Sequence, residues 1–279
     1  MRRSDSLDAA LDSLCGFLDR HARLFVLTGA GCSTGSGIPD YRDADGNWKR
    51  TPPVNFKDFM GSAAVRQRYW ARSFVGWPRF CRASPNTAHH ALAALERQDR
   101  VNLLVTQNVD GLHQAAGSRR VIDLHGRIDR VRCTDCGATL PRATLQEDLL
   151  RSNPEWHAAP GQTAPDGDAD IAEGSFENFV VPGCAHCGGE LKPDVVFFGE
   201  SVPRAWVEQA MRGLERADAM LVVGSSLMVY SGYRFVQAAV RTGKPVAAIN
   251  VGRTRADELL TVKVSGPCAE TLSALIESR

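Results

Sequence analysis

The stretch "LFVLTGAGCSTGSGIPDYR", residues 24–42, joins an apolar run to a glycine-rich turn. An apolar run of this length is typical of a buried parallel strand, and the backbone N–H groups of a glycine turn can approach a phosphate closely. No Gly-Lys-Ser/Thr follows, which excludes the usual P-loop. The dinucleotide pattern G-x-G-x-x-G is half met, because Gly29 and Gly31 fit but Thr34 occupies the third glycine position. A tight turn that binds no ligand is therefore still an alternative interpretation at this point.

The residues after the turn favour a ligand. Asp40, Tyr41 and Arg42 follow Pro39, which pushes the chain toward extended geometry. From there, charged and aromatic side chains can reach back over bound phosphates. We expect a loop that holds a diphosphate and closes over a dinucleotide whose far end reacts.

Further apolar runs alternate with helical patterns along the chain. Strands are predicted at 101–108, 219–226 and 245–252, with a late strand at 259–266. Helical spacing marks 89–98, 206–217, 233–243 and 268–279, and Leu7, Leu11, Leu14 and Leu18 predict an amphipathic helix at the start. The alternation predicts an α/β fold with a doubly wound, mostly parallel, Rossmann-like sheet.

Two segments interrupt this alternation. Residues 45–85 are rich in aromatics and predict a helical insertion, and residues 131–190 begin and end with cysteine pairs. We therefore expect residues 1–130 and 191–279 to form the dinucleotide-binding domain. Residues 131–190 are expected to form a small metal-binding module with an extended loop at 151–180.

The overall composition argues against two classes of partner. The 279 residues are 43% hydrophobic, and 33 Lys+Arg against 32 Asp+Glu give a net charge of +1, so we expect no nucleic-acid and no membrane partner. Asp5, Asp8, Asp12 and Asp19 argue against a secretory or transit peptide. We expect a cytoplasmic protein with reduced cysteines, and the oligomeric state stays open.

Four cysteines have the spacing of metal ligands. Cys133 and Cys136 form one C-x-x-C pair, and Cys184 and Cys187 form the other. Four thiolates suit tetrahedral zinc without an open position, which predicts a structural role. Residues 137–183 separate the pairs by more than the roughly 15–20 residues of a zinc ribbon, so the loop is read as an insertion. Disulfides and a redox pair are the alternatives. The other cysteines, Cys15, Cys32, Cys81 and Cys268, are expected to pack in the protein.

Polar residues follow two of the predicted strands. Gln107, Asn108 and Asp110 come at the end of one apolar strand, and His125 follows the short run "VIDL". Ligands of open α/β sheets lie beyond the carboxyl ends of the strands, so these side chains are candidates for a site. A lone histidine is more often a packed or surface residue, but its position favours a general base acting on a hydroxyl.

Taken in order, these motifs resemble the sirtuins, NAD-dependent protein-lysine deacylases. The matching motifs are "GAGCSTGSGIPDYR", "TQNVDGLH", "LHG", the two C-x-x-C pairs, "KPDVVFFGE", "VGSSLMVY" and "INVG", from about residue 20 to the end. "RQRYWARSFVGWP", "APDGD" and "KPDVVFFGE" look closest to the class II branch, which includes a mitochondrial lipoamidase-type sirtuin.

The resemblance implies a role for each matching residue. His125 would be the general base, and Asn108 would be catalytic and hold the nicotinamide end with Asp110. Contacts with NAD are implied for Gly29, Ala30, Gly31, Ser33, Thr34, Gly37, Ile38, Pro39, Asp40, Tyr41, Arg42, Gln107, Asn108, Val109, Asp110, Gly224, Ser225, Ser226, Asn250, Val251, Gly252 and Cys268. The edge Val196, Phe197, Phe198 and Gly199 would receive an acyl-lysine protein or peptide as an added strand.

The resemblance also implies the reaction: nicotinamide leaves NAD, and the acyl group passes to ADP-ribose, which yields O-acyl-ADP-ribose and free lysine. Tyr69 and Arg72 have the Tyr-x-x-Arg spacing of the acid-acyl recognition pair in desuccinylating sirtuins. A preference for dicarboxyl acyl groups is one interpretation, and a surface arginine paired with a protein acid is the other. Mono-ADP-ribosyl transfer, lipoamide hydrolysis and a non-enzymatic NAD-sensing module remain alternative functions.

Overall fold

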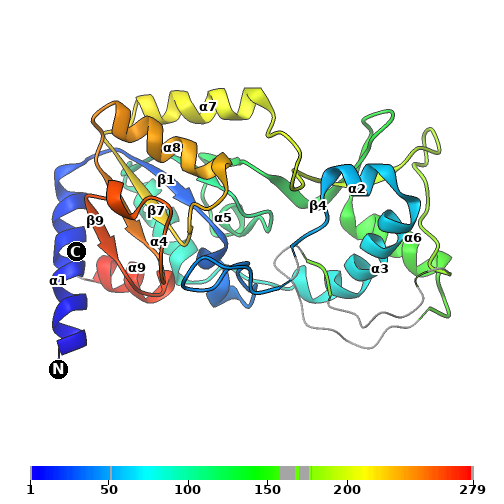
Figure 1. The fold of residues 1–279 in the computed structure, drawn as a ribbon, viewed down its shortest axis with the longest axis horizontal. Helices are drawn as coiled ribbons and strands as arrows, with labels where there is room; N and C mark the ends of the chain where they lie inside the picture. Colours follow the sequence, from blue (N-terminus) through cyan, green and yellow to red (C-terminus); the bar gives the residue numbers. More distant parts are fainter. Residues whose placement is uncertain (1, 51, 157–166, 170–175, 177, 278–279) are drawn as a thin grey trace.

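The structure is a computed structural model and describes residues 2–50, 52–156, 167–169, 176 and 178–277. The molecule is elongated, with a larger lobe built around a parallel sheet and a smaller lobe that contains α2, α3, α6 and β4 (Figure 1). Both ends of the chain lie on the larger lobe, at the end away from the smaller one.

A six-stranded parallel sheet forms the centre of the larger lobe, as the sequence predicts. Its strand order is β3-β2-β1-β7-β8-β9. The strands are β1 (Leu24–Thr28), β2 (Val101–Thr106), β3 (Val121–Asp123), β7 (Ala219–Val223), β8 (Val246–Ile249) and β9 (Val262–Val264). Several end earlier than expected, because the polar residues at their carboxyl ends leave the ladder and turn toward a cavity. The predicted late strand at 259–266 is shorter in the structure: β9 spans Val262–Val264, and Leu259 lies in the short 3-10 helix η3 (Asp257–Leu259).

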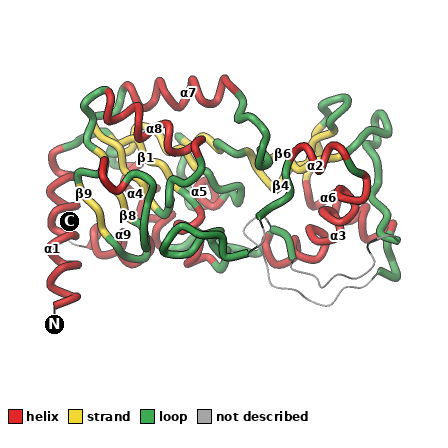
Figure 2. The backbone as a smooth tube through the Cα atoms, in the orientation of Figure 1, coloured by secondary structure: helices red, strands yellow, loops and turns green. Residues whose placement is uncertain are grey.

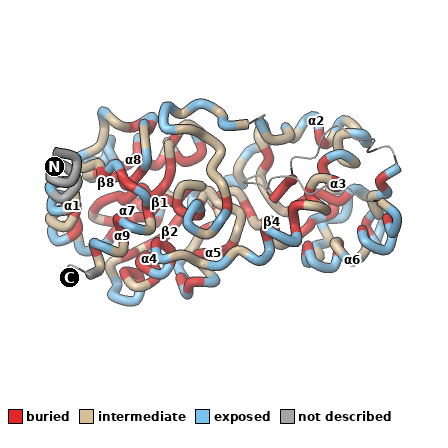
Figure 3. The backbone as a smooth tube through the Cα atoms, turned by 90° about the horizontal axis from the view of Figure 1, so that it is seen from below, coloured by how far each residue is buried: buried red, intermediate tan, exposed pale blue. Residues whose placement is uncertain are grey.

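Helices cover both faces of this sheet, so its central strands β1, β7 and β8 are buried along their whole length. Leu24 and Val26 point to one face, where α1 (Arg2–Arg20), α4 (Thr87–Arg97) and α9 (Cys268–Glu277) pack. Phe25 and Leu27 point to the other face, where α7 (Arg204–Glu215) and α8 (Tyr230–Arg241) pack. In Figures 2 and 3 the strands form the buried layer between helices.

The N-terminal helix has the predicted apolar face. Leu14 and Leu18 are buried on the sheet, and Leu11 packs beside them half-buried. Leu7 falls outside the residues whose side chains the structure describes.

The smaller lobe has an antiparallel sheet of order β5-β4-β6. Its elements are β4 (Gly126–Cys133), β5 (Thr139–Pro141), β6 (Leu191–Val195), α2 (Phe56–Gly61), α3 (Ala63–Phe80) and α6 (Arg142–Ser152). Its core buries Phe59, Trp70, Leu145, Leu149 and Phe179. The indole N–H of Trp70 donates to the carbonyl of Leu191 at 3.1 Å and ties α3 to β6. A short helix, α5 (Leu112–Ala115), follows β2 in the larger lobe.

The smaller lobe draws on more of the chain than residues 131–190. β4 begins at Gly126 and β6 runs to Val195, and α2 and α3 come from the predicted helical insertion. Phe59, Tyr69 and Trp70 of these helices are buried in the core of the antiparallel sheet, whereas Trp77 and Phe80 at the end of α3 pack with Ile38 and Leu112 of the larger lobe. Helix α6 occupies the start of the predicted loop 151–180, and residues 157–166, 170–175 and 177 of that loop lie outside the described residues.

Across the part of the chain that is described, no helix is both long enough and apolar enough to cross a bilayer.

Candidate functional site

A cavity of about 760 Å³ lies where the turns after β1 and β7 meet, and it extends to the smaller lobe. β1 and β7 are neighbours at the centre of the sheet, and the chain leaves them toward opposite edges. Open α/β sheets bind ligands at such a switch point. The predicted residues that line the cavity are Gly29, Ala30, Gly31, Ser33, Ile38, Asp40, Tyr41, Arg42, Tyr69, Gln107, Asn108, Val109, Asp110, His125, Val196, Phe197, Phe198, Gly199, Gly224, Ser225, Ser226, Asn250 and Val251.

The remaining candidates do not line the cavity: Thr34, Gly37, Pro39, Arg72, Gly252 and Cys268. Thr34 begins the 3-10 helix η2 (Thr34–Ser36) and donates its hydroxyl to the carbonyl of Gly31. Cys268 is 5% exposed, and its Sγ lies 3.8 Å from the carbonyl oxygen of Ile249. Cys268 thus packs in the core against β8, and its implied contact with NAD stays a prediction.

Two glycines allow the turns after β1 and β7 to touch. Gly31, in the 3-10 helix η1 (Ala30–Cys32), donates its N–H to the carbonyl of Gly224 at 2.9 Å. Gly224 has φ of +64°, and a Cβ added there would lie 2.2 Å from the backbone nitrogen of Cys32. A larger residue would push the two turns apart, so this floor requires glycine.

Above this floor, three polar side chains form one network. The Asn108 amide donates to the carbonyl of Gly29 at 3.1 Å and to the hydroxyl of Ser33 at 3.0 Å. Ser33 donates in turn to a carboxylate oxygen of Asp110 at 2.6 Å. The other oxygen of Asp110 accepts from the backbone N–H of Leu112 at 2.9 Å. The network fixes Asn108 and Asp110 beside the glycine turn, as the sequence pattern suggested.

His125 has a partner at each ring nitrogen. Nδ1 lies 2.9 Å from the carbonyl oxygen of Gln107, which can only accept, so Nδ1 carries the hydrogen. Nε2 therefore presents its lone pair, and it lies 2.8 Å from the hydroxyl of Ser231. Burial lowers the pKa of His125 to about 4; the Gln107 carbonyl opposes this shift and Arg234 adds to it. The imidazole is thus neutral at pH 7, as a general base requires.

Buried neutral histidines make the fold sensitive to acid. The pKa of His113 is lowered to about 3 by burial, and that of His125 to about 4, whereas an unfolded histidine titrates near 6.5. Below about pH 6.5 the unfolded chain takes up protons that the folded chain does not. The free energy of unfolding therefore decreases as the pH is lowered. We expect the free energy of unfolding to drop by about 2 kcal/mol per buried imidazole between pH 8 and pH 5.

Urea denaturation at several pH values checks this acid sensitivity. His113→Gln should weaken the pH dependence, while His90→Gln, at an exposed position on α4, should leave it unchanged. Equal stability of the wild-type protein at pH 8 and pH 5 would contradict the argument.

An aromatic wall closes the side of the cavity near the smaller lobe. Tyr41, Trp48 and Phe198 meet edge to face, with ring centroids 5.5–6.4 Å apart. The Arg42 guanidinium lies 4.0 Å from the centre of the Trp48 ring, and donates to the carbonyl of Gly46. Sequence reasoning missed Trp48, and the signal available was a tryptophan six residues after the glycine-rich motif.

Of the predicted pair Tyr69 and Arg72, Tyr69 lines the cavity and Arg72 does not. Tyr69 lines the cavity and packs against Phe59 and Phe197. Arg72 instead lies with its Nε 3.4 Å from a carboxylate oxygen of Asp168, whose side chain is 5% exposed. The two side chains thus differ in their contacts: Tyr69 packs in the aromatic core, and Arg72 lies beside Asp168.

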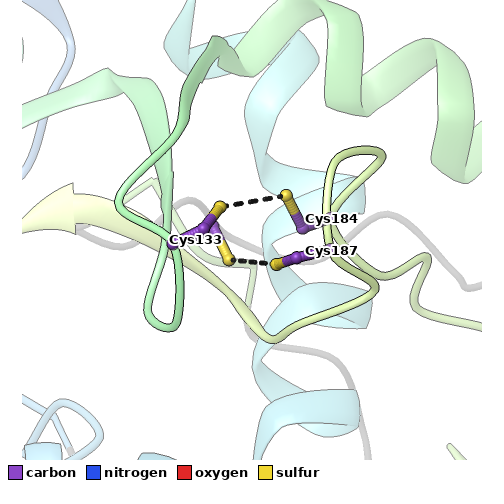
Figure 4. A group of neighbouring side chains, drawn as sticks. Cys133, Cys184 and Cys187 are labelled. Carbon is purple, nitrogen blue, oxygen red and sulfur yellow. Dashed lines mark hydrogen bonds between the residues drawn. The ribbon is translucent and has the colours of Figure 1, made fainter.

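The four predicted metal ligands come together in the smaller lobe. Sγ of Cys133 lies 3.6 Å from Sγ of Cys187, and Sγ of Cys136 lies 3.8 Å from Sγ of Cys184 (Figure 4). All four sulfur atoms lie within 4.8 Å of one another. Zinc with four bonds of about 2.3 Å places its sulfurs about 3.8 Å apart, so this cluster fits tetrahedral zinc.

The chain is similar to known proteins over nearly all its length. Residues 29–231 match the model of the Sir2 family. A "NAD-dependent protein deacetylase" of Xanthomonas axonopodis pv. citri (strain 306) is 64% identical over 94% of this chain and 90% of its own. The human "NAD-dependent protein lipoamidase sirtuin-4, mitochondrial" is 51% identical over 92% of this chain and 82% of its own.

Solved structures agree with this family. One from a study of "the Mechanism and Regulation of Sir2 Enzymes" has a TM-score of 0.77 at 32% identity and covers 97% of both chains. "Sir2 bound to acetylated peptide" has a TM-score of 0.75 at 28% identity, over 96% of this chain and 98% of that one. The chain therefore belongs to the Sir2 family, the sirtuins.

Proposed function

We propose that this sirtuin is an NAD-dependent protein-lysine deacetylase that transfers the acyl group to ADP-ribose. The observation that carries the proposal is the neutral imidazole of His125, which keeps a lone pair at Nε2 and lines a cavity floored by a glycine turn. Relatives more than 60% identical carry the name NAD-dependent protein deacetylase.

Residues in different parts of the cavity have different proposed roles. The glycine turn of Gly29–Gly31 suits a diphosphate, and Asn108 with Asp110 suits the carboxamide end of NAD. NAD supplies an anomeric carbon whose cationic nicotinamide leaves, so that the amide oxygen of an acyl-lysine can attack there. Nε2 of His125 takes the proton of a ribose hydroxyl, which can then attack the acyl carbon. Free lysine, nicotinamide and O-acyl-ADP-ribose are the expected products.

The substrate side of the cavity suits a peptide. Phe198 accepts from the backbone N–H of Phe56 at 2.8 Å, and Val196 donates to the carbonyl of His125 at 2.8 Å. This short edge brings Val196, Phe197, Phe198 and Gly199 to the mouth of the cavity, where an acyl-lysine peptide can pair as an added strand. The similarity to a sirtuin structure with an acetylated peptide supports this placement.

An assay of product formation tests the function. The purified protein is incubated with NAD and an acetyl-lysine peptide, and mass spectrometry follows peptide, nicotinamide and O-acetyl-ADP-ribose. Equimolar formation of all three products supports the proposal. A peptide or protein that gains the mass of ADP-ribose, without losing its acetyl group, would indicate ADP-ribosyl transfer and contradict it.

We propose neutral acyl groups as the preferred substrates. Besides Tyr69, the side of the cavity toward the smaller lobe is lined by Ile128, Val195 and Phe197, and Arg72 faces Asp168. The 51% identity to a lipoamidase sirtuin supports placing the chain near the class II branch, and the apolar lining suits lipoyl-lysine as a second substrate.

Arg72→Ala tests the acyl preference. We expect the ratio of acetyl to succinyl turnover to change by less than about two-fold, because the Arg72 side chain lies outside the cavity lining. Turnover is measured on acetyl, succinyl, glutaryl and lipoyl peptides, with Arg82→Ala, at an exposed position after α3, as the matched control. A loss of ten-fold or more on succinyl peptide alone would show that Arg72 reads a carboxylate.

We also propose that the cluster of Cys133, Cys136, Cys184 and Cys187 holds one structural zinc ion. The sulfur–sulfur distances of 3.6 and 3.8 Å support this assignment. Four thiolates leave no open coordination position, so the ion would brace the smaller lobe and take no part in catalysis.

A further inference from the structure

We propose that Ser231 is a positioning residue for His125: its hydroxyl donates to the neutral base and then accepts from the protonated one. The inference rests on the proposed function, because it concerns the same proton transfer. Ser231 lies outside the motif "VGSSLMVY", which ends one residue before it.

The start of α8 is packed directly on the segment that holds His125. Ser231 is the second residue of α8 and is 9% exposed. A Cβ added at the next residue, Gly232, would lie 2.7 Å from the side-chain nitrogen of Gln107. Gly232 therefore lets the helix approach closely enough for Ser231 to reach Nε2 of His125 at 2.8 Å.

Gln107 is fixed from both sides. Its side-chain oxygen accepts from the hydroxyl of Ser225 at 2.6 Å, and its backbone N–H donates to the carbonyl of Thr28 at 2.9 Å. Its own carbonyl holds Nδ1 of His125. The imidazole is thus held at one nitrogen by the turn after β2 and at the other by the first turn of α8.

A hydroxyl suits this position because it can both donate and accept. In the resting protein Ser231 donates to the lone pair of Nε2. When a ribose hydroxyl approaches, the Ser231 hydrogen turns away by rotation about Cβ–Oγ. The ribose O–H bond then breaks, an N–H bond forms at Nε2, and the new N–H can donate to Oγ.

The surroundings of His125 make such an acceptor useful. The imidazole is half-buried, and Arg234, one turn along α8 and lining the same cavity, disfavours a positive charge on it. Hydrogen bonds from a charged donor are roughly twice as strong as neutral ones. Ser231 therefore stabilises the protonated base more than the neutral base, and its effect should appear in turnover.

Ser231→Ala, with Ser231→Thr as the conservative variant, tests the proposal. We expect Ser231→Ala to lower kcat about ten-fold, with Kd for NAD within about two-fold of wild type and an unchanged melting temperature. Ser231→Thr keeps the hydroxyl and should restore kcat to within about three-fold. Thr242→Ala removes a hydroxyl at the other end of α8 and should have no effect.

Nitrogen-15 NMR of the histidine rings in the resting protein provides a readout independent of catalysis. The Nε2 resonance of His125, assigned with His125→Ala, should shift in Ser231→Ala while the Nδ1 resonance stays in place. If the wild-type protein shows no deacetylation, the proposed function fails while this spectrum still tests the contact.

Four outcomes would overturn the proposal. A kcat of Ser231→Ala equal to or above wild type would mean that the Ser231 hydroxyl does not assist proton transfer to His125. Failure of Ser231→Thr to rescue, or a melting temperature that falls in step with activity, would mean that Ser231 acts through packing. An unchanged Nε2 resonance would show that the hydrogen bond between Ser231 and His125 does not form in solution.

Discussion

His125→Ala is expected to lower kcat for deacetylation by about 10²–10⁴-fold, the usual contribution of a general base. Nε2 of His125 is the basic nitrogen that the structure places in the cavity beside the turn of Gln107 and Asn108. Removing the imidazole leaves the glycine floor and the network of Ser33, Asn108 and Asp110 intact. NAD affinity should therefore stay within about three-fold of wild type, as measured by calorimetry, because the base acts after binding.

His90→Ala is the matched control for this experiment. His90 is exposed on α4, outside the residues that line the cavity, so its removal should change neither kcat nor NAD affinity. The catalytic role of His125 is wrong if His125→Ala turns over within about two-fold of wild type. It is also unsupported if the variant loses NAD binding to the same extent as turnover, since that would indicate a damaged pocket.

Cys133→Ser is expected to release the metal and destabilise the smaller lobe. Structural zinc contributes on the order of 10 kcal/mol to the folding of a small module, and the cluster joins β4 to the segment before β6. Because Tyr69 and Phe197 line the cavity from this lobe, its loss should also abolish turnover. Elemental analysis of the purified protein and thermal unfolding followed by circular dichroism measure the two effects.

Cys81→Ser is the matched control, because Cys81 is an exposed cysteine after α3, away from the cluster. It should keep one equivalent of zinc and an unchanged melting temperature. A strong chelator should reproduce the effect of Cys133→Ser on the wild-type protein, and added zinc should reverse it. Retention of zinc and full stability by Cys133→Ser would contradict the proposed metal site.

Local patterns predicted those features that depend on neighbours in the chain. The apolar runs that became β1, β2, β7 and β8 specify the parallel sheet, because a strand buried on both faces needs apolar residues throughout. The two C-x-x-C pairs and the glycine turn are short motifs whose chemistry is contained in a few consecutive residues. His125 could be found for the same reason, since it directly follows a strand.

Local sequence patterns could not predict the contacts between segments that are distant in the chain. The aromatic-rich composition of residues 45–85 predicted a helical insertion but could not say that α2 and α3 would pack on the antiparallel sheet, which takes strands from 126–133 and 191–195. Likewise, the spacing of Tyr69 and Arg72 could not reveal Asp168, a partner far along the chain.

The amino-acid sequence alone determined the parallel α/β sheet, the glycine turn, the candidate base and the cysteine cluster, because strand burial, turn geometry and ligand spacing are properties of short segments. Only the tertiary structure decided that Cys268 packs under β8, that Arg72 faces Asp168, and that Ser231 reaches Nε2 of His125. The physical reason is that a side chain's partner across the fold depends on how helices and strands pack, and residues far apart in the sequence fix that packing.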